Sequence, residues 1–268
     1  MPLEWEYADD TDFMDEDKIT LQKLYQICEN IFQEWNLKVN NDKTEFTEFY
    51  LAQKDQVDGK GEALKGREEW RENVALGSRL CTTADIKYRC NRGNHAFQEY
   101  NKVWLQGPKI SLITKIKIYE SLVTSVILYN SNSWATCKKT LNTLDVCQRK
   151  HLRQIVNMQW PKVKISNVNL YKKCNLKPLS ERVADSRWRM LGHVLRSEDN
   201  SPAVLALDFA IRSDETMNGR LERHQTNLLS VIRKDLKSRN ISLKTISDFQ
   251  NIREVARDRK LWRKMCLV

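Results

Sequence analysis

Tyr7-Ala8-Asp9-Asp10 is the stretch from which the fold of this 268-residue chain is first inferred. Two short, partly alternating runs flank it, Glu4–Tyr7 and Thr11–Met14. Such runs around an aspartate-rich turn predict a β-hairpin with Asp9 and Asp10 at its turn. Adjacent carboxylates suit a hard divalent cation such as Mg²⁺, which prefers oxygen ligands. Asp-Asp is also ordinary turn composition, so both interpretations stay open on these residues alone.

The residues that follow the hairpin change to a helical period. Between Asp15 and Asn36 apolar residues recur at spacings of three and four, and the acidic Asp15–Asp17 suits a first helical turn. The apolar positions are Leu24, Ile27, Cys28, Ile31, Phe32 and Trp35. Val39 and the run Phe46–Leu51 then predict short strands, which would complete a small layered α/β piece. The polar residues 52–72, which contain three glycines, predict a mobile insert.

Five segments, taken in order, resemble the C-terminal half of the reverse transcriptase of non-LTR (LINE-type) retrotransposons. Tyr7–Asp10 is similar to the Y/F-A-D-D box of that family, and Asn40–Thr44 is similar to its N-x-x-K-T box. Leu76–Ser78 resembles part of the Y-L-G-S segment of the primer grip. Leu191–Arg196 and Ala256–Arg263 are further matches, so the resemblance covers nearly the whole chain in one fixed order.

This resemblance implies an RNA-directed DNA polymerase that copies an RNA template from a DNA primer with two Mg²⁺ (or Mn²⁺) ions. Asp9 and Asp10 match the metal-binding pair of the family. Lys43 matches a lysine near the incoming nucleotide, where it would neutralise the triphosphate or protonate the leaving pyrophosphate. The third metal carboxylate and the fingers of the family lie upstream of this box, and six residues precede Tyr7. The metal ions are therefore expected only in the complete family site.

Charge divides the chain into an acidic and a basic part. Residues 1–72 hold 19 acidic and 9 basic side chains, a net charge of −10. The whole chain carries +10, so residues 73–268 carry +20. A segment this basic concentrates polyanions and binds phosphate backbones by releasing counterions. We expect it to bind RNA template and DNA primer, or other duplex nucleic acid, although a solvated charged surface is the ordinary use of lysine and arginine.

The basic part is expected to be helical, because the whole chain holds only eight glycines and five prolines. The periodicity predicts a helix pair over 85–104 that is broken near Gly93, an apolar central helix over 111–128, and a helix opened by Pro178 that ends near Arg196. Further helices are predicted over 140–157, 225–238 and 247–265. The fold class that follows is α+β, mostly α-helical. The resemblance implies that the hairpin and first helix are a small remnant of the palm, followed by a helical thumb and a basic helical domain. The expected domains are 1–51, 52–72, 73–160 and 161–268.

Two helix faces in this part are candidates for contact with phosphates. The first carries Arg149, Lys150 and Arg153, on or beside the face opposite the apolar stripe, together with Gln148. The second carries Arg182, Arg189 and Arg196, which are seven residues apart and therefore share one face. The single His193 in the second helix is expected to be a packed or hydrogen-bonded residue rather than a ligand.

The seven cysteines are irregularly spaced and include no Cys-x-x-Cys pair, which predicts reduced, mostly buried thiols. Cys137, Cys147 and His151 are a less favoured candidate for a zinc site. No apolar run is long enough to cross a bilayer and no signal peptide is visible, so we expect an intracellular protein without a membrane partner. The resemblance implies a nuclear location.

Three functions are therefore open. The chain is a fragment of an RNA-directed DNA polymerase that binds template–primer, a catalytically silent relic that keeps nucleic-acid binding, or a helical interaction protein without a nucleic-acid role. Primer extension separates the first two, and salt-dependent binding separates the second from the third.

Overall fold

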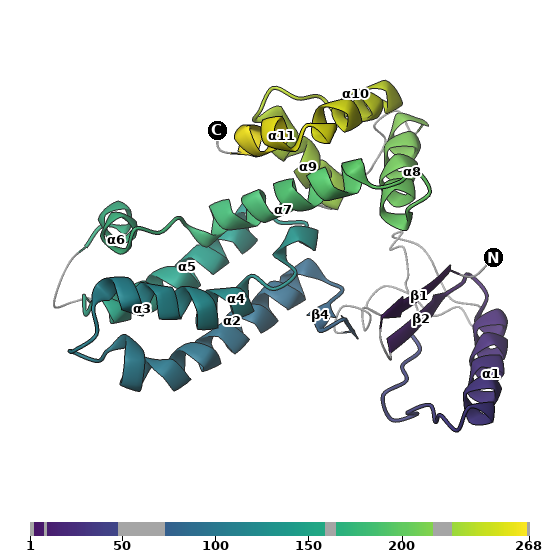
Figure 1. Cartoon of the computed structure of the whole chain (residues 1–268), viewed down its shortest axis with the longest axis horizontal. Helices are drawn as coiled ribbons and strands as arrows, with labels where there is room; N and C mark the ends of the chain where they lie inside the picture. Colours follow the sequence, from purple (N-terminus) through teal and green to yellow (C-terminus); the bar gives the residue numbers. More distant parts are fainter. Residues whose placement is uncertain (1–2, 8–9, 48–72, 159–164, 217–226, 267–268) are drawn as a thin grey trace, which may run out of the picture. The chain divides into compact units, whose positions relative to one another are not determined.

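The computed structural model describes residues 3–7, 10–47, 73–158, 165–216 and 227–266, and the described chain is mostly helical with few strands (Figure 1). This confirms the predicted mostly helical α+β class. The chain forms two compact units, Met1–Leu80 and Cys81–Val268. Each unit is described separately below.

The first unit opens with the predicted β-hairpin. Strands β1 (Leu3–Tyr7) and β2 (Asp10–Met14) pair antiparallel, with Tyr7 opposite Asp10 and Leu3 opposite Met14. The register leaves two residues between the strands, the length typical of the tightest hairpins. Asp10 is therefore the first residue of β2, and Asp9 lies outside the described residues.

Helix α1 (Lys18–Glu34) forms where the periodicity predicted it. Asp17 is its N-cap rather than a first-turn residue: the carboxylate accepts hydrogen bonds from the Ile19 and Thr20 amides, each at 3.1 Å. Hydrogen bonds from the Thr20 side chain and the Ile19 amide lower the pKa of Asp17. The predicted apolar stripe is not a buried one, because no described residue of α1 is buried and the following Trp35 is 75% exposed.

The strand predicted at Val39 and the start of the one predicted from Phe46 are wrong: residues 37–47 form a turn and extended chain without a strand partner. The rest of that second strand, and the insert predicted over 52–72, lie outside the described residues. A second small hairpin follows, β3 (Val74–Ala75) with β4 (Ser78–Arg79). Its two turn residues, Leu76 and Gly77, both have positive φ, 48° and 73°, as a two-residue type I′ turn requires.

The second unit is built from helices. In chain order they are α2 (Thr82–Tyr100), η2 (Asn101–Leu105), α3 (Leu112–Tyr119), η3 (Glu120–Thr124), α4 (Ser125–Ile127), η4 (Ser131–Ser133), α5 (Lys138–Ile155), α6 (Asn167–Cys174), α7 (Leu179–Arg196), α8 (Pro202–Thr216), α9 (Leu228–Lys237), α10 (Ile246–Arg257) and α11 (Arg259–Cys266). The segments η2 and η3 are π-helical, and η4 is a short 3₁₀ turn.

The first core of this unit lies between α2, the continuous helix α3–η3–α4, α5, α6 and the start of α7. The predicted break near Gly93 does not occur, because α2 runs through it. Gly93 is instead a point of close approach: a Cβ there would lie 2.3 Å from Cγ1 of Ile127. The predicted central helix is present, but it buries one face only, since Ile113 is 72% exposed.

The second core lies between the end of α7 and helices α8, α9, α10 and α11. Helix α8 was not predicted from the sequence. The helix predicted over 247–265 is two helices, because the chain turns at Asp258, whose Oδ1 accepts hydrogen bonds from the Lys260 and Leu261 amides and so caps α11.

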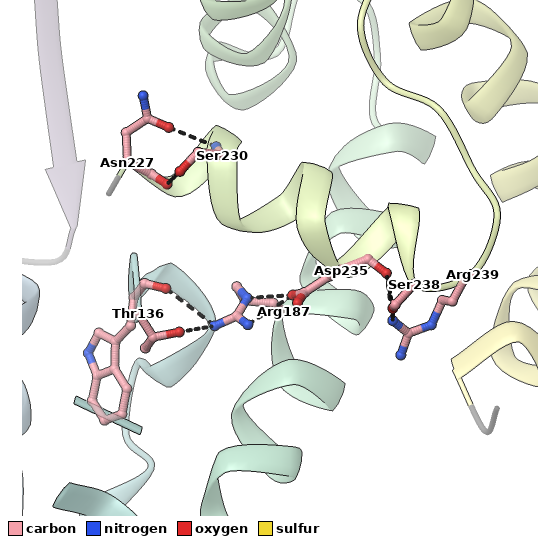
Figure 2. A network of polar contacts seen from close by, with 8 residues as sticks. Thr136, Arg187, Asn227, Ser230, Asp235, Ser238 and Arg239 are labelled. Atoms are coloured by element: carbon pink, nitrogen blue, oxygen red, sulfur yellow. Dashed lines mark hydrogen bonds and ion pairs between the residues drawn. The ribbon is translucent and has the colours of Figure 1, made fainter. Parts of the chain in front are cut away.

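Helix α7 belongs to both cores, so the two cores share one element. Leu179 and Val183 lie in the first core, whereas Trp188, Leu191 and Leu195 lie in the second. Between them stands Arg187, only 3% exposed, which the pattern of apolar residues did not predict. Its guanidinium contacts Asp235 of α9 on one side and the segment after η4 on the other (Figure 2).

Candidate nucleic-acid interface

The hairpin next to the candidate metal ligands is short, and its second strand is mostly exposed. Asp10 lies on the surface at the start of β2. Within the described ranges, no three His, Cys, Asp or Glu side chains are placed to hold a metal ion together. The Asp10 carboxylate is of the kind that Mg²⁺ and Mn²⁺ prefer, but adjacent carboxylates such as Asp9 and Asp10 make only part of a two-metal site.

Lys43 is held at the surface by a compact turn. The Asn40 carbonyl accepts hydrogen bonds from the Lys43 amide at 3.0 Å, the Thr44 amide at 3.1 Å and the Thr44 hydroxyl at 3.0 Å. The Tyr25 hydroxyl donates to Oδ1 of Asn41 at 2.5 Å, which ties the turn to α1. The first and last residues of the Asn40–Thr44 segment thus have a structural role, and the Lys43 side chain is exposed to solvent.

The basic residues of α5 differ in their exposure and in the hydrogen bonds that they make. Lys150 is exposed, whereas Arg153 donates from Nη2 to Oδ1 of Asn167 at 2.7 Å and is half-buried. Arg149 and Arg153 both lie near Tyr171, and burial raises the pKa of that tyrosine despite the two cations. These residues from α5 and α6 form a basic surface that is partly occupied by its own hydrogen bonds.

The expectation that Gln148 lies on the exposed face is wrong. Gln148 is fully buried: its Nε2 donates to the Lys177 carbonyl at 3.2 Å and its Oε1 accepts from the Leu179 amide at 3.0 Å. It satisfies one of the free amides at the N-terminus of α7, where Pro178 at the N-cap offers no side-chain acceptor. The side chain is therefore a structural link between α5 and α7.

The three candidate arginines of α7 have different surroundings. Arg182 donates from Nη1 to both oxygens of Glu120, each at 2.7 Å, and Arg196 donates from Nη1 to the Ala256 carbonyl at 3.0 Å. Arg189 is exposed, and its Nε donates to the Asp185 carbonyl of its own helix at 3.3 Å. His193 is exposed as well, so the expectation that it is packed is not met.

Most acidic groups near these cations already have structural roles. Among the described residues of the second unit, seven carboxylates form ion pairs: Asp85–Arg89, Glu120–Arg182, Asp185–Lys177, Asp199–Arg253, Asp208–Arg212, Asp235–Arg187 and Glu254–Arg257. Asp145 binds Ser180, while Asp248 and Asp258 cap α10 and α11. The second unit, residues 81–268, holds 35 basic and 16 acidic side chains, so a net charge of +19 remains within it.

Sequence reasoning missed some of the exposed basic residues. Helix α11 exposes Arg259, Lys260, Arg263 and Lys264, while Trp262 between them is buried. Arg259 and Arg263 were not singled out, because the 247–265 segment was treated as one straight helix. The spacing of the two Arg-Lys pairs by four residues around a tryptophan was the available signal.

Comparisons of the chain with family models, with curated proteins and with solved structures found no match. Among the described helices, none is long and apolar enough to cross a membrane.

His151, one of the residues considered for zinc, is buried in the first core. Its ring stacks on Phe97 with the centroids 4.1 Å apart. Nε2 lies 2.8 Å from Oδ1 of Asn94 and Nδ1 lies 3.3 Å from the Tyr119 hydroxyl, so both ring nitrogens have protein partners. This arrangement fits a neutral ring that donates to Asn94 and accepts from Tyr119 rather than a metal ligand. Burial, assisted by Lys150, lowers the pKa of His151 to about 4.

We expect this histidine to make the stability of the chain pH-dependent. Below pH 6.5 the His151 ring binds a proton in the unfolded state, whereas in the folded state it does so only below about pH 4. As the pH is lowered from 6.5 to about 4, the free energy of unfolding should therefore decrease by about 1.4 kcal/mol per pH unit, and by about 3 kcal/mol in all. Urea unfolding at pH 7, 6 and 5 measures the effect. His151→Gln should flatten the dependence, and an equal slope in that variant would contradict the assignment.

Proposed function

We propose that this chain is a fragment of an RNA-directed DNA polymerase of the non-LTR retroelement type, and that its second unit binds template–primer nucleic acid through the phosphate backbone. The observation that carries the binding proposal is the charge balance of that unit. Its carboxylates are largely engaged in ion pairs and helix caps, and its exposed helix surfaces retain a large excess of lysine and arginine. The polymerase assignment rests on the ordered resemblance of five segments.

Contacts of this kind position a duplex without reading its sequence. Lysine and arginine side chains on helix surfaces bind phosphate oxygens, which are the same at every base pair. The exposed basic side chains lie on α5, α6, α7 and α11, including Lys150, Lys173, Arg189 and Lys260. We therefore expect duplex binding with little sequence preference and a strong dependence on salt.

Catalysis by these 268 residues alone is not part of the proposal. Two-metal phosphoryl transfer needs carboxylates that hold both ions, with the primer hydroxyl and the triphosphate between them. Asp9 and Asp10 would supply one side of such a site, and Lys43 would at best assist a leaving group. The chain on its own is thus a nucleic-acid-binding piece of a larger catalytic assembly.

A helical interaction protein is the second candidate, and one observation favours it. Val103 and Trp104 of η2 and Ile113 of α3 are at least half exposed, and these two helices pack against each other. Exposed apolar side chains that cluster often mark protein contacts. This function predicts binding that salt does not weaken.

The experiment is a fluorescence-anisotropy titration of the full chain with a labelled RNA–DNA template–primer at several salt concentrations. If about five phosphates are neutralised, the slope of log K against log salt should be about −4 to −5. The same complex, given Mg²⁺ or Mn²⁺ and all four nucleotides, should show no primer extension.

Two controls decide between the candidates. Asp9→Asn with Asp10→Asn should leave duplex affinity unchanged, because the proposed phosphate contacts come from lysines and arginines of the second unit. A flat salt response would favour the interaction protein. Template-directed extension by the chain alone, lost in Asp9→Ala, would show that it is a complete polymerase.

A further inference from the structure

Helix α11 is fastened to α7 by two tryptophans that interlock. The rings of Trp188 and Trp262 stack with centroids 4.1 Å apart and an interplanar angle of 10°. Each indole N–H donates to the backbone carbonyl of the other residue, at 2.9 and 3.1 Å. Gly192 makes room for the contact, since a Cβ there would lie 2.2 Å from Nε1 of Trp262. The two segments that are 74 residues apart therefore have a defined mutual position.

This fastening joins the two helices that carry Arg196, Arg259 and Arg263. Arg196 lies near the end of α7, where its bond to the Ala256 carbonyl directs it toward the start of α11. Arg259 and Arg263 are one helical turn apart on α11 and are exposed. Burial lowers the pKa of Arg196, and so does the positive charge of Arg259 and Arg263. We name these three residues the α7–α11 arginine cluster.

Three of the carboxylates next to the cluster in sequence are already engaged. Asp258 accepts the Lys260 and Leu261 amides, Glu254 pairs with Arg257 at 2.9 Å, and Asp199 pairs with Arg253. Within the described ranges, Arg259 and Arg263 take part in none of the ion pairs of the unit. Packing therefore holds like charges near one another, which is unfavourable unless an anion joins them.

We propose that the α7–α11 arginine cluster is the principal phosphate-contact site of the second unit, and that it grips the backbone of a nucleic acid. This inference rests on the proposed function, and it assigns the phosphate contacts to particular residues of α7 and α11. A guanidinium presents a planar fork of donors that matches the oxygens of a phosphate, and it stays charged even where burial is partial. Lys260 and Lys264 are exposed on the same helix, so positive charge continues beyond the three arginines, as a polyanion requires.

Three other arginines are less suited to this role. Arg182 is committed to both oxygens of Glu120, Arg187 is buried against Asp235, and Arg153 donates to Asn167. To bind a phosphate, each of them would first give up a bond that it already makes, and that exchange reduces the gain. The arginines of α11 make no such exchange.

The test compares two double variants that remove the same net charge from the full chain. Arg259→Gln with Arg263→Gln removes two members of the cluster, and Lys234→Gln with Lys237→Gln removes two cations of α9 that are also exposed. With a labelled 16-base-pair duplex at 0.1 M salt, we expect the first variant to bind at least about tenfold more weakly, with a salt slope smaller by about 2. The second variant should lose no more than about threefold.

Folding and the identity of the anion are tested separately. Arg259→Lys with Arg263→Lys keeps the charge, so its salt slope should equal that of the wild type; a slope reduced as in the glutamine variant would overturn the proposal. Equal losses in the α9 and α11 glutamine variants would also overturn it, while leaving duplex binding itself intact. A wild-type chain that binds no duplex would refute the proposed function instead. Tighter binding to phosphatidylserine vesicles than to the duplex would assign the cluster to a membrane surface and overturn the nucleic-acid proposal.

Discussion

Arg187→Met is expected to lower the free energy of unfolding of the chain by about 3–5 kcal/mol, the cost of leaving one partner of a buried ion pair without the other. The guanidinium bonds Asp235 of α9 through Nε and Nη2, both at 2.9 Å. Nη1 donates to the Thr136 hydroxyl at 3.1 Å and to the Trp134 carbonyl at 3.4 Å (Figure 2). Methionine fills a similar volume but satisfies none of these groups. Urea unfolding followed by far-UV circular dichroism measures the loss.

A matched control lies on the same helix. Arg182→Met removes an arginine that also binds a carboxylate with two short bonds, but both side chains of that pair are roughly one-third exposed. Solvent compensates the lost bonds there, so the expected cost is about 1 kcal/mol or less. Adding Asp235→Leu to Arg187→Met should recover part of the loss, because the orphaned carboxylate is then gone. Equal effects of the two single substitutions would show that Arg187 does not join the two cores.

Trp262→Ala is expected to cost about 3–5 kcal/mol, as is typical when a buried aromatic side chain is truncated. The ring is 2% exposed, stacks on Trp188 and donates to the Trp188 carbonyl. Without it, α11 loses its main contact with α7. We therefore also expect Trp262→Ala to weaken duplex binding, because Arg259 and Arg263 lose their defined position. Thermal unfolding and the anisotropy titration provide the two measurements.

Gly192→Ala supplies a control, because its effect on stability should have opposite signs in the wild type and in the Trp262→Ala variant. In the wild type the added Cβ would collide with Trp262, so overpacking should destabilise the chain by about 1–3 kcal/mol. In the Trp262→Ala background the collision is absent, and the higher helix propensity of alanine should make the same substitution stabilising by up to about 1 kcal/mol. A destabilising effect of equal size in both backgrounds would mean that Gly192 does not serve to admit the indole.

The local sequence pattern was enough to predict the elements whose structure depends on residues close together in the chain. The hairpin of β1 and β2, the extents of α1 and α5, and the buried stripe of α7 follow from turn composition and periodicity. Such features depend on a few residues in sequence order, and the spacing of their apolar side chains repeats with the geometry of a strand or helix. The net charge of the second unit is likewise a property of composition alone.

The candidate site was only partly predictable, because a local pattern does not show which side chains meet distant parts of the chain. Arg149, Lys150 and Arg189 were selected by helix face, and the structure leaves Lys150 and Arg189 exposed. A helical wheel treats Arg182 and Arg196 as equivalent to Arg189. The structure separates them, because Glu120 and the Ala256 carbonyl, each about 60 residues away, accept their hydrogen bonds. Gln148 is buried for a similar reason, since its amide matches the start of α7.

The sequence by itself determined the elements, the apolar faces and the sign of the charge on each part of the chain. Only the tertiary structure decided which polar residues became internal links, such as Arg187, and which cations were left to face solvent together, such as Arg259 and Arg263. The physical reason is that a charged side chain has no preferred partner along the chain. Its role depends on the distance to groups that folding brings close, and here that distance is set by glycines and tryptophans at the crossings of helices.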